Sequence, residues 1–273
     1  MCRLAGLVAA PGRVPPPLSS LLSDPPHSLS HQARSPRQQR PGVVNVDGTG
    51  VTWWAPDAPE PLRYVSDGPP WSDANLPWLA PRLRSDVQLA LVRSATSGIP
   101  YGANFVSPFI HGPLACAHNG WVGRFREATA RPLLARLPDR LFAAYHGASD
   151  SLAVFLTVLA EAERRPSADL ATALHHALDV VRLVCEEHHA HARLNVVVAD
   201  GTRVVAARYA VGEPTDSLWT LQGGRRWDGA SLVASEPLDD DPAWTRVPDG
   251  GIVELTADGV RGAAVEQGEA CTR

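Results

Sequence analysis

Residues 2–10 of the sequence read Cys2-Arg-Leu-Ala-Gly-Leu-Val-Ala-Ala10, and the turn residues Pro11 and Gly12 follow directly. A short apolar run that ends at such residues is typical of a strand buried on both faces. The run is at the lower length limit of a signal peptide and lacks the charged segment that would precede it. It therefore predicts a first strand within a hydrophobic core, with a cysteine at the N-terminal end of that strand.

The composition indicates a chain that builds a large core and uses no lysine chemistry. Its 273 residues are 44% hydrophobic and 20% charged, and we expect one domain over residues 2–261 and a flexible tail over residues 262–273. The net charge of −4 argues against a general nucleic-acid-binding protein. All 25 basic residues are arginine, which excludes Schiff-base, pyridoxal-phosphate and P-loop lysines, and we expect no cofactor.

Cysteine usage and hydropathy bear on the compartment. The 4 cysteines show no C-x-x-C spacing and do not make a disulfide framework in a chain of this length. No apolar run approaches the roughly 18 residues of a membrane helix. We therefore expect a cytoplasmic protein that acts on a small molecule, without a membrane, nucleic acid or obligatory protein partner.

The order of the predicted elements favours a single α+β domain with a layered core. Ser149, Asp150 and Ser151 offer capping side chains before the helical run Leu152–Leu159, and apolar spacing predicts a second helix from Leu170 to about Glu187. A weaker helix is expected over Leu76–Leu83. Further strands are predicted at Val51–Trp54, Val87–Arg93, Leu114–Ala117, Leu194–Ala199, Val204–Arg208, Leu218–Leu221, Leu232–Ser235 and Ile252–Leu255.

Polar residues at the ends of these strands are candidates for chemistry. Cys2 combines a nucleophile with a base if Met1 is removed, because the freed α-amine, with a pKa of about 7.7–8.0, can take the thiol proton. Arg93 follows a buried strand and can offer a bidentate fork to a carboxylate, with the Thr96 hydroxyl as a further donor. Taken alone, each residue also fits an ordinary structural role, such as a buried cysteine or a salt bridge at the rim.

Two further stretches carry groups suited to amide chemistry. In His118-Asn-Gly120, the side-chain amide of Asn119 and the backbone N–H of Gly120 form a suitable pair of oxyanion donors. Asp150, at a helix N-terminus, can accept a hydrogen bond from a substrate ammonium group. An Asn-Gly turn and a helix cap are the structural alternatives for these two stretches.

The order of these stretches resembles that of the class II glutamine amidotransferases. Cys2-Arg3 is followed by Asn45-Val-Asp-Gly-Thr-Gly50, Arg93-Ser-Ala-Thr-Ser-Gly98, His118-Asn-Gly120, Ser149-Asp-Ser151 and Val233-Ala-Ser-Glu-Pro-Leu238. The resemblance implies the N-terminal-nucleophile hydrolase fold, a four-layer αββα sandwich with two antiparallel sheets. It also implies a hydrolase that cleaves a linear amide C–N bond through an N-terminal cysteine.

Other stretches are similar to the members of this family that act in ergothioneine biosynthesis. They are Asp24-Pro-Pro-His-Ser-Leu29, His31-Gln32, Pro36-Arg-Gln38, Val43-Val-Asn45 and Ser235-Glu-Pro-Leu-Asp-Asp-Asp-Pro242. The likeness implies hydrolysis of the γ-glutamyl amide bond of γ-glutamyl-hercynylcysteine S-oxide, which releases glutamate and hercynylcysteine S-oxide. A glutaminase, which would need a separate synthase, or a hydrolase of another γ-glutamyl peptide is the alternative within the family.

The resemblance also implies a role for each matching residue. Cys2 is expected to attack the γ-carbonyl with its freed amine as general base, while Asn119 and Gly120 form the oxyanion hole. Arg93, helped by Thr96, is expected to hold the α-carboxylate of the glutamyl group. Asp150 is expected to bind its α-ammonium. A γ-glutamyl group carries one fixed anion and one fixed cation, so one arginine and one aspartate suit it.

The sequence departs from the family pattern in two places. The glycine turn has Thr49 where an aromatic residue is common and Thr52 where a third glycine is usual, which bears on loop geometry and substrate shape. The segment 121–148 between two site motifs is longer than the pattern suggests, and is either a specificity lid or a plain insertion.

Several residues support competing interpretations. Cys116 precedes His118 and resembles half of a Cys-His pair, although its place in an apolar strand favours packing. Tryptophans can line a pocket for a quaternary ammonium through cation–π contact, and the candidates are Trp53, Trp54, Trp71 and Trp121. A metal-binding or non-catalytic protein is the alternative from another class, because cysteine and histidine cluster at Cys185, His188, His189 and His191, with His175 and His176 upstream.

Overall fold

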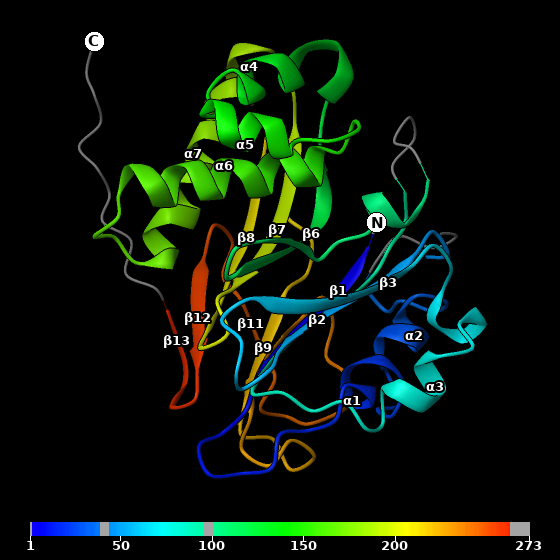
Figure 1. The fold of residues 1–273 in the computed structure, drawn as a ribbon. Helices are drawn as coiled ribbons and strands as arrows, with labels where there is room; N and C mark the ends of the chain where they lie inside the picture. The colour runs from blue at the N-terminus through cyan, green and yellow to red at the C-terminus, as the bar shows by residue number, and fades with distance from the viewer. Residues whose placement is uncertain (1, 39–43, 96–100, 263–273) are drawn as a thin grey trace.

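The computed structural model describes residues 2–38, 44–95 and 101–262 and contains two antiparallel sheets (Figure 1). One sheet has the strand order β11 (Thr245–Arg246), β9 (Trp219–Gln222), β10 (Ser231–Ala234), β1 (Arg3–Val8), β4 (Val87–Val92), β2 (Thr49–Trp54) and β3 (Pro61–Ser66). The other has the order β13 (Gly259–Gly262), β12 (Ile252–Thr256), β8 (Val204–Val211), β7 (Ala192–Ala199), β6 (Leu114–Val122) and β5 (Phe109–His111).

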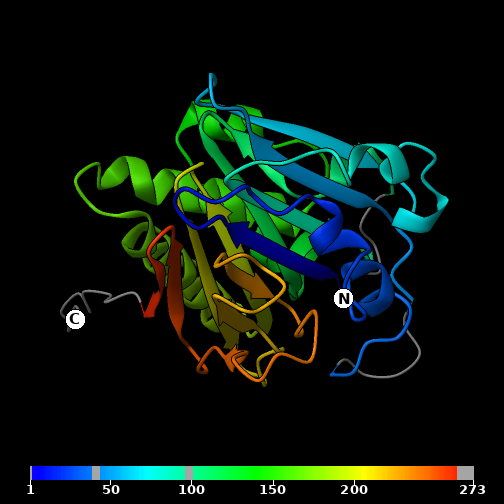
Figure 2. The same cartoon turned by 90° about the horizontal axis from the view of Figure 1, so that it is seen from below.

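Helices lie on the outer side of each sheet, as Figures 1 and 2 show from two directions. The six-stranded sheet packs against α6 (Asp150–Arg164) and α7 (Leu170–Glu187), with α4 (Ala130–Leu134) and α5 (Asp139–Ala144) beside them. Three short helices, α1 (Ser19–Leu22), α2 (Leu29–Gln32) and α3 (Leu76–Leu79), cover the seven-stranded sheet. The expected α+β sandwich with antiparallel sheets is thus confirmed.

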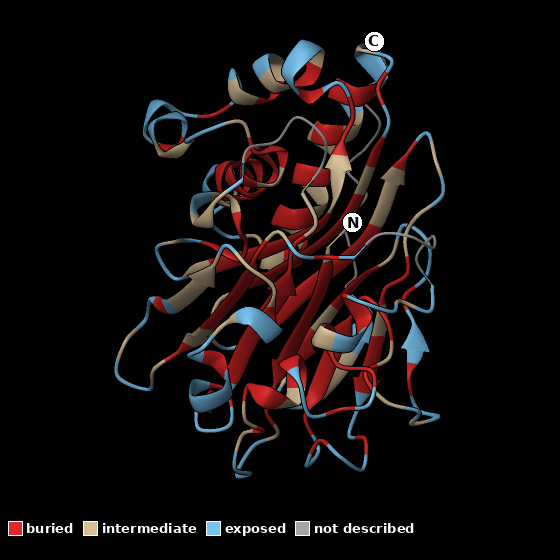
Figure 3. Ribbon diagram, turned by 90° about the vertical axis from the view of Figure 1, so that its right-hand side faces the viewer, coloured by how far each residue is buried: buried red, intermediate tan, exposed pale blue. Residues whose placement is uncertain are grey.

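The first strand shows how the sequence builds these layers. Side chains alternate between the two faces of a strand. In β1, Leu4 and Val8 pack in the core between the sheets, whereas Ala5 and Leu7 pack in the core under α1–α3. Every residue of this strand is buried, as predicted, and Figure 3 shows that the central strands are buried along most of their length. Apolar residues on both faces are therefore the reason that β1 lies in the middle of the sandwich.

The largest difference between a predicted and an observed strand end concerns β6. We expected this strand to stop at Ala117, but it continues to Val122 and contains His118, Asn119 and Gly120. It pairs with β7 along its whole length, from Ala115 opposite Ala199 to Val122 opposite Ala192. The turn tendency of the Asn-Gly pair is therefore outweighed by a continuous ladder of hydrogen bonds to β7.

Smaller differences occur at other element ends. The helix expected over Leu76–Leu83 ends at Leu79. No strands were predicted for β3, β5, β11 and β13, which are the four edge strands of the two sheets and have few buried residues. β13 includes Gly262, one residue inside the range expected as a tail. Within the described ranges, no helix combines the length and apolar character needed to cross a membrane.

The segment 121–148 belongs to the helical layer. It contains the end of β6, a π-helical turn at Phe125–Thr129, and helices α4 and α5. Its side chains Leu133 and Leu141 are buried in the core that α6 and α7 share with the six-stranded sheet. Because it contributes to this core, the segment is an integral part of the domain and does not have the exposed character of a lid.

Candidate active site

Strand alternation gathers three of the predicted site residues at one end of the layer between the sheets. Leu4, Leu91 and Ala117 all belong to the core of that layer. Cys2 lies two positions before Leu4, while Arg93 and Asn119 lie two positions after Leu91 and Ala117, so alternation places these side chains on the same face. Because β1 and β4 are antiparallel with Arg3 opposite Val92, the start of β1 lies beside the end of β4.

Asn119 is connected to the strand of Cys2 through Ser235. Its Nδ2 atom donates to Ser235 Oγ at 3.4 Å, and the same oxygen accepts a hydrogen bond from Leu4 N at 3.0 Å. Ser235 N also donates to Leu4 O at 2.9 Å. Asn119 is buried, and its Oδ1 atom has no hydrogen-bond partner in the part of the chain that the structure describes. Ser235 thus links Asn119, on the six-stranded sheet, to Leu4, which lies two residues after Cys2 on the seven-stranded sheet.

The Cys2 thiol lies against the backbone that follows β4. Its Sγ atom is 3.5 Å from Ser94 N, which donates to it, and 3.6 Å from Ser94 O. Burial raises the pKa of the Cys2 thiol above its ordinary value, although the hydrogen bond from Ser94 and the charge of Arg93 act in the opposite direction. The sulfur is therefore protonated at neutral pH, and its use as a nucleophile requires a nearby base.

The glycine turn at residues 45–50 holds the segment that carries Arg93. Arg93 N donates to Gly48 O at 2.7 Å, and Asp47 N donates to Arg93 O at 3.1 Å. The Asp47 carboxylate accepts from Ala95 N at 2.7 Å. Gly48 has a φ of +140°, and a Cβ there would lie 2.4 Å from Val106 Cγ2, so a side chain does not fit. Thr96, the expected second donor to the substrate carboxylate, lies outside the described residues.

Gly120 is required by the close approach of two strands. A Cβ at this position would lie 1.9 Å from Arg193 O on β7 and 2.7 Å from the His118 ring.

The two threonines of the glycine turn are both buried in β2, and Thr49 Oγ1 donates to Gly68 O at 2.9 Å. Thr49 is therefore accommodated within the sheet between Gly48 and Gly50, whereas the Thr52 hydroxyl is buried without a hydrogen-bond partner in the described residues.

Asp150 is the first residue of α6 and is buried against the end of β6. The cap is Ser149, whose Oγ accepts from Leu152 N at 3.2 Å, as the sequence predicted. Asp150 Oδ2 accepts from Val122 N at 3.0 Å, and Oδ1 accepts from Ser151 N at 2.8 Å. The carboxylate is thereby tied to β6 two residues beyond Gly120, and the role of Asp150 in binding a substrate ammonium stays a prediction.

Comparison with known proteins identifies the family. The sequence profile of the glutamine amidotransferases of class II matches residues 17–222. This chain is a class II glutamine amidotransferase family member. The family is one of amidohydrolases, and the resemblance inferred from the order of motifs is confirmed.

Several characterised proteins resemble this family member over nearly its full length. The γ-glutamyl-hercynylcysteine sulfoxide hydrolase of Mycobacterium tuberculosis is 36% identical over 272 residues, which cover 98% of each chain. The protein of that name from Mycolicibacterium smegmatis is 34% identical and covers 93% of this chain and 96% of its own.

Solved structures agree on the fold. A glutamine aminotransferase class-II domain protein from Silicibacter pomeroyi superposes with a TM-score of 0.69 at 26% identity, covering 96% of this chain and 98% of its own. An allosteric regulatory enzyme of purine biosynthesis has a TM-score of 0.62 at 16% identity, covering 98% of this chain and 50% of its own. The latter likeness concerns the fold alone.

A buried ion cluster that the sequence analysis did not predict includes Arg3, the residue next to Cys2. Glu236 is fully buried and accepts from Arg3 Nη1 at 2.9 Å, from Arg37 N at 2.8 Å and from Gln38 N at 3.0 Å, and it lies 2.8 Å from His27 Nε2. Burial alone would raise the pKa of Glu236, but these hydrogen bonds and the charge of Arg3 hold it below its ordinary value. Arg3, next to Cys2, is fixed by this cluster.

The sequence analysis also did not predict the position of the His118 side chain. Its side chain points away from Asn119, toward the helices, because neighbours on a strand face opposite sides. Its Nδ1 lies 2.9 Å from Ser151 Oγ and its Nε2 lies 3.0 Å from Arg193 O. Burial lowers the pKa of His118. His118 therefore joins β6, β7 and the start of α6 around Gly120 and Asp150.

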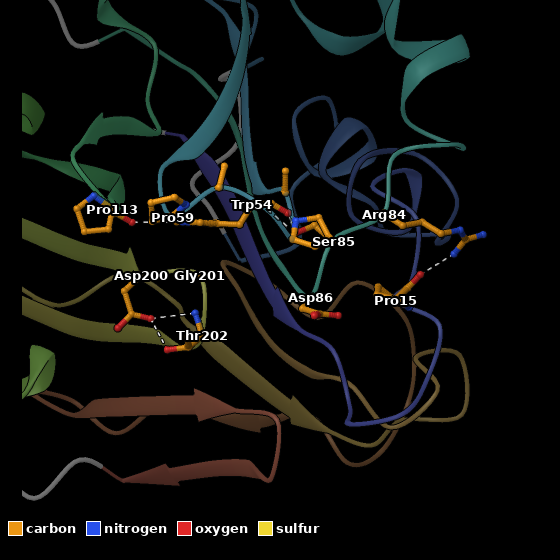
Figure 4. A pocket seen from close by; sticks show the side chains of 13 residues that line it. Pro15, Trp54, Pro59, Arg84, Ser85, Asp86, Pro113, Asp200, Gly201 and Thr202 are labelled. Atoms are coloured by element: carbon orange, nitrogen blue, oxygen red, sulfur yellow. Dashed lines mark hydrogen bonds between the residues drawn. The ribbon is translucent and has the colours of Figure 1, made fainter.

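The tryptophans named as candidate pocket walls lie in different places. Trp121 follows Gly120 on β6 and adjoins the site. Trp71 packs under the guanidinium of Arg34 at 3.9 Å. Trp54 lies at the far end of β2, where it lines a cavity of about 690 Å³ together with Pro59 and Ser85 (Figure 4). This cavity is at the opposite end of the sandwich from Cys2.

The two other cysteines among the described residues pack in the core between the six-stranded sheet and the helices. Cys116 and Cys185 are both buried there, and burial raises the pKa of each thiol, that of Cys185 to about 11. Neither thiol has the partial exposure that a reactive cysteine needs. Among residues 2–38, 44–95 and 101–262, no three Cys, His, Asp or Glu side chains gather in a way that could hold a metal ion.

Proposed function

We propose that this family member hydrolyses the γ-glutamyl amide bond of γ-glutamyl-hercynylcysteine sulfoxide, releasing glutamate. The observation that carries the proposal is the convergence of Cys2, Arg93 and Asn119 at one end of the layer between the sheets. The substrate is suggested by the hydrolases of that name, which are 34% and 36% identical over nearly the whole chain.

Removal of Met1 creates the reactive group in this proposal. The freed α-amine of Cys2 takes the proton of the thiol, which burial keeps protonated, and the resulting thiolate attacks the γ-carbonyl carbon. The carbonyl electron pair moves onto oxygen, and the Asn119 amide and the Gly120 N–H donate to that oxyanion. When the tetrahedral intermediate collapses, the C–N bond breaks and the α-ammonium returns its proton to the leaving amine.

The second half of the reaction regenerates the enzyme. The glutamyl group remains on Cys2 as a thioester, and the leaving amine departs. The α-amine then removes a proton from water, whose oxygen attacks the thioester carbon. Cleavage of the C–S bond gives the free γ-carboxylate of glutamate, and the thiolate recovers its proton from the ammonium.

Recognition of the glutamyl group falls to Arg93 and Asp150. The Arg93 Nη1 atom donates to Asp47 O in the glycine turn at 3.4 Å, and in this proposal the guanidinium pairs with the substrate α-carboxylate through charge-assisted hydrogen bonds. Asp150 accepts from Val122 N and from Ser151 N, and a carboxylate has about four acceptor positions, so a substrate ammonium can still bind it. The two charges of a glutamyl group are thereby matched by opposite charges.

A substrate panel tests the proposal. Purified protein, with loss of Met1 verified by intact mass, is incubated with the hercynylcysteine sulfoxide conjugate, with glutamine and with glutathione, and glutamate is measured by mass spectrometry. We expect the conjugate to have the highest kcat/KM. Preferred release from glutamine would identify a glutaminase instead, and an absence of glutamate from all three would contradict the proposed class of substrate.

A further inference from the structure

Asp216 carries a buried carboxylate oxygen that no group in the described residues satisfies. It lies in the segment between β8 and β9, where its Oδ1 pairs with Arg193 Nη1 at 3.1 Å. Its Oδ2 is buried and has no hydrogen-bond partner, and it is the one carboxylate oxygen in this condition within the described chain. An unpaired buried acceptor is costly, so the structure is expected to supply a donor in the active state.

The chain around Asp216 is attached to the nucleophile's strand. Ser217, the next residue, donates from Oγ to Ser235 O at 2.8 Å. Ser235 in turn accepts from Leu4 N and from the Asn119 amide. Asp216 is therefore connected through two serines to both the start of β1 and the candidate oxyanion residue.

The electrostatic effect of Asp216 on the pKa values of neighbouring residues agrees with this placement. Burial lowers the pKa of Arg3 and of His118, and the charge of Asp216 is among the influences that raise each of them. Burial raises the pKa of Asp216 itself, while the charges of Arg193 and Arg3 lower it. Asp216 thus interacts electrostatically with Arg3, the residue next to Cys2, and with His118.

We propose that Asp216 is a positioning residue that receives the α-ammonium of processed Cys2 on its unpaired Oδ2. The inference rests on the proposed function, because it concerns the amine that acts as general base there. In the first step the amine becomes an ammonium as the thiol loses its proton. A carboxylate beside it stabilises that positive charge while the tetrahedral intermediate forms, and orients the nitrogen toward the sulfur.

Other charged groups also face this region and set the background for the amine. Arg93, directly after β4, and Arg3, on β1, are cations, and Arg3 is paired with Glu236, which also pairs with His27. Arg193 on β7 is held by both Glu213 and Asp216. His118 and Asp150 lie beyond Gly120, and their side chains are engaged with Ser151 and Val122. Only Asp216, within the described residues, combines a negative charge with a buried unpaired acceptor.

The absence of lysine makes the amine directly measurable. After removal of Met1, the α-amine is the single primary amine in the sequence, so reductive methylation with ¹³C-formaldehyde gives one NMR signal. The measurement uses a Cys2→Ala background, because a free N-terminal cysteine would cyclise with formaldehyde. The pH dependence of the ¹³C shift then reports the pKa of this amine without any need for catalysis.

We expect Asp216→Asn to lower the amine pKa by about one unit or more, the effect of removing an adjacent opposite charge. Glu213→Gln is the matched control, since it removes the other carboxylate on Arg193 and should leave the amine pKa unchanged. An unchanged pKa in Asp216→Asn, or an equal fall in Glu213→Gln, would overturn the proposal. If the asparagine variant does not fold, Asp216→Ser makes the same comparison.

Activity gives an independent readout in the enzyme that retains Cys2. The acidic limb of kcat/KM should move to lower pH in Asp216→Asn and stay in place in Glu213→Gln. A limb that does not move would contradict the role of Asp216. Failure of the wild-type protein to hydrolyse any γ-glutamyl substrate would instead contradict the proposed function, and the NMR titration would still decide the placement of Asp216.

Discussion

The two ends of the layer between the sheets differ in how their polar groups are satisfied. At the end where β1 ends, Trp54, Pro59 and Ser85 line the cavity of about 690 Å³ (Figure 4). Polar groups there bond to one another: Ser85 Oγ accepts from Trp54 N at 3.1 Å, and Asp200 Oδ1 accepts from Thr202 N at 3.0 Å.

The end where β1 begins holds buried polar groups with unused capacity. Asn119 Oδ1 and Asp216 Oδ2 are both buried without a partner in the described chain. Unsatisfied buried groups are uncommon in folded proteins and mark places where a ligand or reaction supplies the missing partner. The comparison shows that the cavity of about 690 Å³ and the candidate nucleophile lie at opposite ends of the layer, so the candidate active site is not in that cavity.

The largest expected effect is the loss of the nucleophile. Cys2→Ala should reduce γ-glutamyl hydrolysis to background, a loss on the order of 10⁶ by analogy with removal of a hydrolase nucleophile. Glutamate release is the measurement, and circular dichroism verifies the fold. Cys116→Ala is the matched control, because its buried thiol packs in another layer and its loss should affect stability and not turnover. Turnover retained by the Cys2 variant would remove this end of the layer from the chemistry.

The second-largest expected effect is a loss of stability at the end of the layer where β1 begins. Glu236→Gln should lower the free energy of unfolding by about 3–5 kcal/mol, because it leaves the buried Arg3 and His27 without their carboxylate. Since the pKa of Glu236 is depressed on folding, its stabilisation is present above the ordinary glutamate pKa of about 4.3 and fades as the pH falls through the folded value.

Urea unfolding of both proteins at neutral pH and at a series of values below about pH 4, under the ordinary glutamate pKa, measures this difference. The gap between wild type and Glu236→Gln should be wide at neutral pH and narrow in acid. A gap that is constant with pH would show that the carboxylate charge is not what stabilises this end.

The third-largest expected effect is the loss of an oxyanion donor. Asn119→Ala should lower kcat by about 10²–10³ and leave KM near its original value. Asn195→Ala is the neighbouring comparison, since Asn195 lies opposite Asn119 on β7 but bonds to Ser217 O at 2.9 Å. Steady-state kinetics on both variants separate the two roles. An effect of Asn119→Ala confined to KM would point to substrate binding instead.

The smallest effects come from a pair of arginine variants, one at each end. Arg93→Lys should raise KM by about 10- to 100-fold, the loss of one charge-assisted hydrogen bond to the substrate carboxylate. Arg84→Lys, at the rim of the distal cavity, loses only a bond to Pro15 O and should leave kcat and KM unchanged. Equal effects in the two variants would mean that the distal cavity takes part in substrate binding.

The sequence predicted the parts of this arrangement that depend on local pattern. The apolar run after Cys2 predicted a strand buried on both faces, and Ser149 predicted the start of α6. The pairing of β6 with β7 was not visible locally, so Asn119 and Gly120 were expected in a turn and lie in a strand. The position of Gly120 in the ladder explains why no side chain fits there.

Long-range contacts account for what sequence reasoning missed. Arg3 and Glu236 are 233 residues apart in the chain, and His27 and Glu236 are 209 residues apart. Neither spacing produces a periodic signal, so the buried cluster beneath Cys2 is visible only after folding. Asp216 lies in a segment without regular structure and was not a candidate for the same reason.

The most direct test of the account is the site at which an electrophilic glutamine analogue reacts. Wild-type protein is inactivated with an analogue that carries an alkylating carbon in place of the γ-amide, and its peptides are mapped by mass spectrometry. We predict one adduct, on Cys2 of a chain that has lost Met1, and none on Cys116 or Cys185. An adduct on another residue, or full turnover by chains that retain Met1, would contradict the claim that Cys2 and its freed amine form the active site.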